Sequence, residues 1–273
     1  AWKSVDGGDF FIKRSNWLFW PFGQISVDSV EGGPGYVHAD IPAVYYHPLE
    51  PEKVFLATDG GVFSSEDGGL SYTTHNGGLQ TTQFYAKMSR STTGPNRCIG
   101  GTQDNSTYIY RGEPSWYRVI GGDGMSAAIQ AQNDQVVFGS AQGLYVVKST
   151  DGGLSFTNVS PDRIDGDRVA FSAPYEIAPS NDQIMYAGSQ ILYRSSNAAE
   201  SWTPTRNVAI DGFNRCVKIG ISPFDPDIVY VAMAPDPFTG NGSAKVFKST
   251  DGGQTFDQMM GLPDRVCKDI TID

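Results

Sequence analysis

The chain has little of what marks membrane-spanning or nucleic-acid-binding proteins. No stretch approaches the roughly 18 consecutive apolar residues of a membrane span. Lys and Arg together number 20 against 30 Asp and Glu, the net charge is -10, and no block of basic residues occurs. Nucleic acid and anionic membranes are therefore not expected as partners. So acidic a surface favours solubility and is compatible with cations or neutral sugars as ligands.

Cysteine and helical patterning are scarce as well. The three cysteines, Cys98, Cys216 and Cys267, are too few and too scattered for a disulfide framework or a CxxC metal site. No long apolar run has the 3.6-residue period of a helix. Glycine (32 residues), proline (16) and aromatic residues (12%) are abundant instead, which favours many short strands joined by turns.

One phrase recurs along the chain, with the frame Ser-x-Asp-x-Gly-x-Ser/Thr-aromatic. It predicts a hairpin turn, because Asp and Ser cap backbone N–H groups and Gly supplies the positive φ that the turn needs. The final aromatic residue is expected to begin the next strand and to pack between sheets. The Ser and Asp of the copies are Ser4 and Asp6, Ser65 and Asp67, Ser149 and Asp151, and Ser249 and Asp251, and a degenerate copy begins at Ser195.

The spacing of the copies predicts an all-β fold, a β-propeller of four-stranded antiparallel blades. If Tyr108–Trp116, which keeps the strand and the final Ser-Trp, is counted as a sixth, degenerate copy, most copies lie about 40 to 54 residues apart, which is the length of one such blade. Five complete blades are expected, with half a blade at residues 1–15 and a single inner strand at residues 265–273. Residues 1–273 are therefore interpreted as one propeller region, cut from a longer repeat protein. The complete blades are expected at residues 36–74, 84–120, 126–159, 173–205 and 216–259.

Propeller geometry separates the loops onto two faces. With the strands of a blade lettered A to D from the inside, the A–B and C–D turns share one face, and the B–C turns and D–A connections share the other. The boxes occupy the first face, where their side chains are used in holding turns. Six ligand-binding candidates are expected on the second face, around a central funnel: His38, Asp40, Asp59, Gln103, Asp104 and Asp123.

The stretch Trp17–Phe22 is too aromatic for a solvated loop. One interpretation is a plug that covers a propeller face. The alternative is a platform on which sugars stack, with Trp17 and Trp20 as ligand contacts.

The boxes resemble the Asp-box, or bacterial neuraminidase repeat (BNR), of sialidases, xyloglucan-cleaving glycosidases and sortilin-type receptors. The runs Tyr36–Asp40, Thr58–Phe63, Asn76–Tyr85 and Gly100–Asn105 look like the large secreted propeller proteins of bacteria described as glycosyl hydrolase-like or sortilin-like. This resemblance implies a secreted or cell-surface location, and a glycan or an extracellular protein as partner. In that group a second His commonly follows the His-Ala-Asp phrase. This chain has Pro42 there, so no metal or catalytic role is carried over.

Two classes of function remain. The favoured hypothesis is a non-catalytic extracellular module that binds a ligand or a protein or glycan partner. The alternative is a glycoside hydrolase, sialidase-like or cleaving β-glucan or xyloglucan, that uses paired carboxylates on the face opposite the boxes. The sequence assigns no catalytic residue and no metal ligand. Calcium is the one cofactor left open, and a calcium site needs about six to eight oxygen ligands.

The cysteines are predicted to be free thiols. Aligning Ile219–Ser222 with Ile270–Asp273 places Cys216 and Cys267 at equivalent positions on adjacent inner strands. Inner strands diverge around a propeller, whereas a disulfide needs Cα atoms about 4.4–6.8 Å apart.

Overall fold

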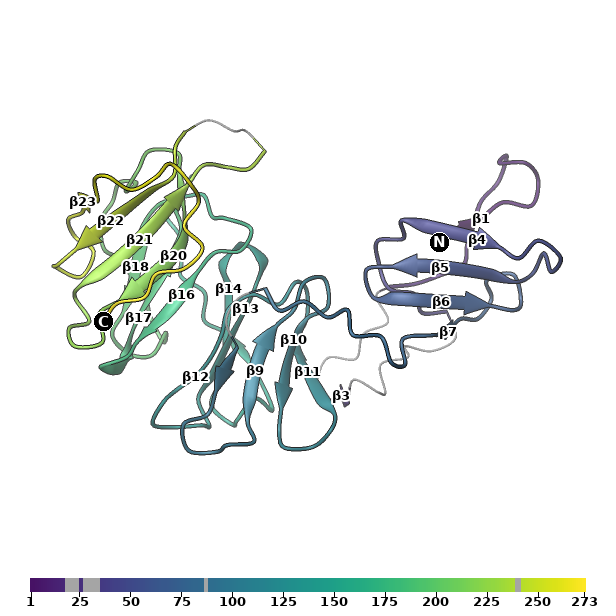
Figure 1. The fold of residues 1–273 in the computed structure, drawn as a ribbon, viewed down its shortest axis with the longest axis horizontal. Helices are drawn as coiled ribbons and strands as arrows, with labels where there is room; N and C mark the ends of the chain where they lie inside the picture. The colour runs from purple at the N-terminus through teal and green to yellow at the C-terminus, as the bar shows by residue number, and fades with distance from the viewer. Residues whose placement is uncertain (18–24, 27–34, 86–87, 239–241) are drawn as a thin grey trace.

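The computed structural model describes residues 1–17, 25–26, 35–85, 88–238 and 242–273, and these form a β-propeller fold. Successive antiparallel sheets follow one another along the chain, and within each blade the four strands pair in sequence order (Figure 1). The five predicted blades are present, and the N-terminal half blade is the hairpin of β1 (Trp2–Lys3) and β2 (Ile12–Lys13).

The blades run from an inner A strand to an outer D strand. Blade 1 consists of β4 (Ala43–Tyr46), β5 (Val54–Thr58), β6 (Gly61–Ser65) and β7 (Thr73–Thr74); blade 2 of β8 (Ser89–Arg90), β9 (Cys98–Gly101), β10 (Thr107–Tyr110) and β11 (Trp116–Ile120); blade 3 of β12 (Ala127–Ile129), β13 (Val137–Ala141), β14 (Tyr145–Ser149) and β15 (Thr157–Asn158); blade 4 of β16 (Tyr175–Ala178), β17 (Asn181–Gly188), β18 (Leu192–Ser195) and β19 (Thr203–Pro204); and blade 5 of β20 (Arg215–Ile221), β21 (Val229–Ala234), β22 (Lys245–Ser249) and β23 (Asp257–Gln258).

The boxes of blades 1, 3 and 5 form the predicted C–D turn through the same set of hydrogen bonds. In blade 5, the Ser249 hydroxyl donates to Asp251 Oδ1 (2.8 Å) and accepts the N–H of Gly253 (2.8 Å). The other carboxylate oxygen, Oδ2, accepts the Thr255 hydroxyl (2.6 Å). Gly252 and Gly253 both have positive φ, at 72° and 92°, which explains the paired glycines. The same pattern recurs in blades 1 and 3.

Backbone hydrogen bonds confirm that the boxes share a face with the A–B turns. In blades 1, 3 and 5 the first Gly of the box donates its N–H to an A–B carbonyl of its own blade, as Gly152 does to Gln135 O (2.9 Å) and Gly252 to Asp227 O (2.9 Å). Gly68 makes the equivalent bond to Glu52 O (2.8 Å). The B–C turns and D–A connections therefore lie at the opposite ends of the strands.

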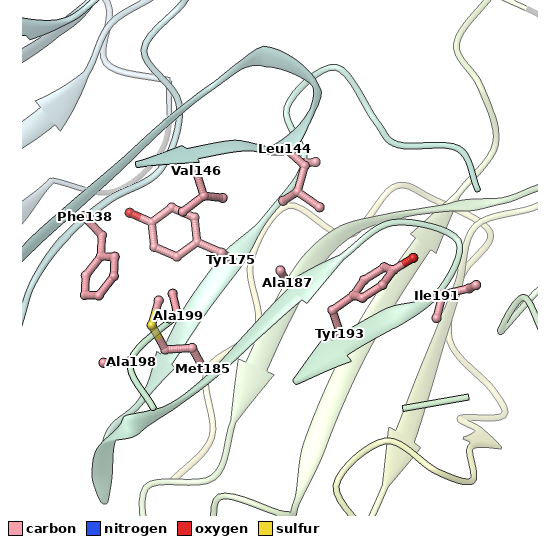
Figure 2. Close-up of a cluster of buried hydrophobic side chains, with 11 residues drawn as sticks. Phe138, Leu144, Val146, Tyr175, Met185, Ala187, Ile191, Tyr193, Ala198 and Ala199 are labelled. Atoms are coloured by element: carbon pink, nitrogen blue, oxygen red, sulfur yellow. The ribbon is translucent and has the colours of Figure 1, made fainter. Parts of the chain in front are cut away.

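Hydrophobic cores between the blades hold blades 2 to 5 together. One cluster spans blades 2 and 3, a second spans blades 3 and 4, and a third spans blades 4 and 5. Figure 2 shows the middle cluster, in which Phe138 of β13 lies beside Tyr175 of β16, with ring centroids 6.4 Å apart. Both rings are at most 1% exposed, and burying a side chain such as Phe138 contributes roughly 1.5–3 kcal/mol.

Three details differ from the sequence-based expectation. The box aromatic residues, such as Phe156 and Phe256, precede the outer strands instead of beginning them, and the outer strand of each blade that carries a box has only two residues. Residues 265–273 carry no strand, although Ile270 packs over Gly220 of β20 where an inner strand would lie. A short strand, β3 (Ile25–Ser26), adds to β11 as a fifth strand of blade 2.

All three cysteines are free thiols, as predicted. Cys216 and Cys267 also hold equivalent local positions, because each lies beside the carbonyl oxygen two residues ahead, Lys218 O (3.4 Å) and Asp269 O (3.1 Å).

Replacing Asp251 by Ala should lower the free energy of unfolding by roughly 1–2 kcal/mol, because the hydroxyls of Ser249 and Thr255 lose their acceptor. Asp251→Asn should lower the free energy of unfolding by less than Asp251→Ala does. Asn197 already stands at this position in blade 4, where its Oδ1 accepts Ser195 Oγ (2.9 Å) and its amide donates to Ser201 Oγ (2.9 Å). Urea unfolding measures both variants, with Asp257→Ala on the exposed β23 as control.

The same hydrogen bonds, led by that of Thr255, hold the pKa of Asp251 at about 2. The folded state therefore binds this proton less readily than the unfolded chain. The stabilisation is present above the ordinary Asp pKa and is lost as the pH falls from about 4 to about 2. This pH dependence should be weaker in Asp251→Asn, and equal acid sensitivity in variant and parent would contradict the assignment.

Candidate functional site

Four carboxylates gather on the face opposite the boxes. Asp40 and Asp59 belong to blade 1, where the Asp59 N–H donates to Asp40 O (3.2 Å) and ties the loop before β4 to the β5–β6 turn. Asp104 lies in the β9–β10 turn of blade 2, and Asp123 lies in the connection between β11 and β12. The negative charges of Asp123, Asp59 and Asp40 all act on Asp104. We call these four residues the acidic cluster.

The turn that carries Asp59 is fixed by its neighbours. Thr58 Oγ1 donates to Gly61 O (2.9 Å) and accepts the Gly60 N–H (3.1 Å). The Asn76 amide donates to Gly60 O (2.7 Å) and its Oδ1 accepts the Val62 N–H (2.9 Å). A Cβ atom at Gly60 would lie 2.3 Å from Cγ of His38, so only glycine fits against the imidazole ring. The Thr-Asp-Gly-Gly phrase is thus a rigid support that leaves the Asp59 side chain exposed.

Asp104 and Asp123 form the closest pair in the acidic cluster. The Asp104 N–H donates to Asp123 Oδ2 (3.3 Å), and the two side chains also share a hydrogen bond. Burial, reinforced by the charge of Asp123, raises the pKa of Asp104. The Tyr85 side chain also hydrogen-bonds to Asp123, and its own pKa is raised by burial and by the two carboxylates.

Two hydrogen bonds join blade 1 to blade 2 at the acidic cluster. His38 Nε2 lies 3.1 Å from Asp104 O, and the Asn105 amide donates to Asp59 O (3.0 Å). The other ring nitrogen of His38, Nδ1, lies 3.1 Å from Ala39 O. Both ring nitrogens therefore face carbonyl oxygens, which can only accept hydrogen bonds.

The acidic cluster lies where blade 2 departs from the repeat. In blades 3 and 4, a Gln of the B–C turn accepts a backbone N–H of the preceding D–A connection, Gln142 from Asp123 (3.1 Å) and Gln190 from Arg168 (3.0 Å). Gln103 is the blade 2 counterpart, and its N–H donates to Gln83 O (2.9 Å) much as that of Gln190 donates to Arg168 O (3.0 Å). The blade 2 turn then continues through additional residues, and these include Asp104.

The remaining candidates from the sequence contribute less. The Gln103 carbonyl accepts the Asn105 amide (3.0 Å) and so shapes the turn. Trp17 is 53% exposed, and Trp20 lies outside the described residues. Sequence reasoning missed Tyr85 and Asn105 as members of the site. Both stand inside runs that carried the family resemblance, but only the packing of the D–A connection against the turn reveals their contacts.

The described residues contain no group of three or more His, Cys, Asp or Glu side chains arranged to hold a metal ion. The structure therefore assigns no calcium site in this part of the chain. Among the same residues, no helix is both long and apolar enough to cross a membrane.

Asp104→Asn should stabilise the protein near neutral pH by at most about 1 kcal/mol, because solvent screens a partly exposed charge. The raised pKa of Asp104 means that the folded state holds this proton more tightly than the unfolded chain. The parent therefore loses stability as the pH rises above the ordinary Asp value of about 4. Asn also tolerates the positive φ of 57° at this position.

Urea unfolding at about pH 4.5 and about pH 7 tests this expectation. The gain should be larger at the higher pH. A variant that is less stable than the parent at neutral pH would contradict it, because it would show that the ionised Asp104 side chain makes a net favourable interaction in the folded protein.

Comparisons with known proteins bear on the fold alone. No protein-family model and no curated protein matches the sequence. Among solved structures, an ancestral GH74 enzyme is similar over 90% of this chain and 34% of its own, with 19% identity and a TM-score of 0.57. The GH74 enzyme of Niastella koreensis is similar over 80% of this chain and 38% of its own, with 17% identity and a TM-score of 0.50. The chain thus spans about a third of the length of these enzymes, with which it shares a β-propeller fold.

Proposed function

We propose that the chain is an extracellular propeller module that binds a neutral glycan at the acidic cluster without cleaving it. The observation that carries this proposal is the convergence of four carboxylates at the turn that breaks the repeat. Side chains that hold a blade together recur from blade to blade, as the box Ser and Asp do. Asp104 has no such counterpart, and the negative charges of its neighbours raise its pKa. A perturbed pKa of this kind is typical of a functional residue.

The charge of the acidic cluster favours sugar hydroxyls over anionic ligands. Ionised carboxylates accept hydrogen bonds from hydroxyl groups. The net charge of -10 would further repel sialosides and other acidic glycans. An oligosaccharide of the β-glucan type offers many hydroxyl donors and no charge, so it is the proposed ligand class. A neutral glycan displayed on an extracellular protein would fit the same site.

Glycoside hydrolysis is the second candidate, because the fold is shared with GH74 enzymes and the raised pKa of Asp104 suits a general acid. The Asp104–Asp123 pair does not suit the two-carboxylate mechanism. Its members are hydrogen-bonded, whereas that mechanism needs carboxyl groups at least about 5 Å apart. A hydrolase would therefore need Asp40 or Asp59 of blade 1 as the partner of Asp104.

Calorimetric titration with cello-oligosaccharides and xyloglucan oligosaccharides tests the proposal. The parent should bind at least one of them, and Asp59→Asn/Asp104→Asn should weaken the binding at least about tenfold, a loss of about 1.4 kcal/mol. The matched control is Asp162→Asn/Asp165→Asn, which removes two exposed carboxylates from the connection before blade 4 and should bind as the parent does.

Equal affinity of the Asp59/Asp104 variant and the parent would overturn the site. Tighter binding of a sialoside than of the neutral sugars would overturn the ligand class. Release of reducing ends by the parent, abolished in Asp104→Asn, would favour the hydrolase instead.

A further inference from the structure

A cavity of about 480 Å³ lies between blades 4 and 5 on the face that carries the boxes. It is bounded by the outer strand β19 of blade 4 and by the box turn of blade 5, and its volume falls within the range of about 300–1,000 Å³ that is typical of small-ligand pockets. We call this cavity the box-face groove. The polar residues that line it include Arg194, Thr203 and Thr205 of blade 4 and Asp227, Asp251 and Gln254 of blade 5.

Direct contacts close the corresponding places between earlier blades. Between blades 3 and 4, Lys148, the residue before the box serine, forms an ion pair with Glu200 of the next box (3.7 Å). The Trp202 indole N–H also donates to Val159 O (2.7 Å). Between blades 2 and 3, Arg111 donates to a carbonyl oxygen of the next box (3.1 Å). Each of these contacts holds the outer part of one blade against the box of the next.

Blades 4 and 5 carry other residues at the positions that close the place between blades 3 and 4. Gln254 takes the place of the glutamate, and its amide donates to Asp251 O within its own box (2.9 Å). Arg194 takes the place of the lysine and pairs with Asp227 in the A–B turn of blade 5 (3.0 Å). Phe256 takes the place of the tryptophan and has no N–H to donate. These three exchanges leave the box-face groove open.

The box-face groove places hydrogen-bond donors beside acceptors. The Arg194 side chain is 31% exposed, and its guanidinium donates to the Tyr186 hydroxyl (3.1 Å) and to Asp227 Oδ1 (3.0 Å) out of five N–H donors in all. The carboxylates of Asp227 and Asp251 accept hydrogen bonds only. Because a hydroxyl group both donates and accepts, the neighbouring hydroxyls of a sugar ring match this lining. An anion would meet two carboxylates, and a cation would meet the guanidinium.

We propose that the box-face groove is a second carbohydrate site, which takes a neutral mono- or disaccharide through the guanidinium of Arg194 and the carboxylates of Asp227 and Asp251. The site goes beyond the glycan site proposed at the acidic cluster and does not depend on it, because the two lie on opposite faces of the propeller. With both sites occupied, one propeller would hold two glycans, one on each face.

Calorimetric titration of the Asp59→Asn/Asp104→Asn protein isolates the box-face groove, because the acidic cluster is already impaired there. At least one of glucose, galactose, mannose, cellobiose and lactose should bind. Adding Arg194→Lys/Gln254→Glu should weaken that binding at least about tenfold, because it restores the Lys–Glu pair that closes the place between blades 3 and 4. The matched control adds Arg90→Lys/Gln258→Glu, the same two exchanges at exposed positions, and should leave the affinity unchanged.

Binding of none of these sugars to the Asp59→Asn/Asp104→Asn protein would overturn the site, and so would equal affinity with and without the groove substitutions. Gln254→Glu alone, at an exposed position, gives a second reading should the combined variant fail to fold, with binding at least about threefold weaker expected. Glucuronate and glucosamine carry a negative and a positive charge on the glucose ring, and tighter binding of either than of the neutral sugars would overturn the ligand class. Because the acidic cluster is impaired throughout, failure of the groove leaves the first glycan site intact.

Discussion

The hydrogen bond between a box serine and the aspartate two residues later is the interaction on which the architecture depends. In blades 1, 3 and 5 it closes the C–D turn, with Oγ to Oδ1 distances of 2.7, 2.7 and 2.8 Å. The turn then presents a backbone N–H to the A–B turn of the same blade, and so fixes how the outer strands lie against the inner ones. Two-residue outer strands such as β7 and β15 have few ladder bonds of their own, so this contact sets their register.

The same regularity makes the exceptions informative. Blades 3 and 4 use Gln142 and Gln190 to tie the opposite loops together, whereas blade 2 extends the equivalent turn and places Asp104 beside Asp123. Two neighbouring carboxyl groups repel each other when both are ionised, so this pair does not stabilise the blade. The extended turn therefore places exposed carboxylate oxygens beside Asp104, whose pKa is raised by burial and by the charges of its neighbours.

The sequence predicted the repeating parts of the fold well, because the box residues form local hydrogen bonds that any copy makes alone. It also placed Asp40, Asp59, Asp104 and Asp123 on one face, since strand order determines which turns share a face. It missed what depends on contacts between blades. The hydrogen bond of Tyr85 to Asp123 and the fifth strand β3 both arise from segments distant in sequence, for which the chain carries no periodic signal.

Hydrogen–deuterium exchange with and without a saturating xyloglucan oligosaccharide tests the central claim most directly. If the acidic cluster is the binding site, protection should appear in the turns at residues 58–61 and 102–106 and in the connection at residues 121–124, while the box turn at residues 149–156 stays unchanged. Protection confined to the box turns, with none at residues 102–106, would contradict this account.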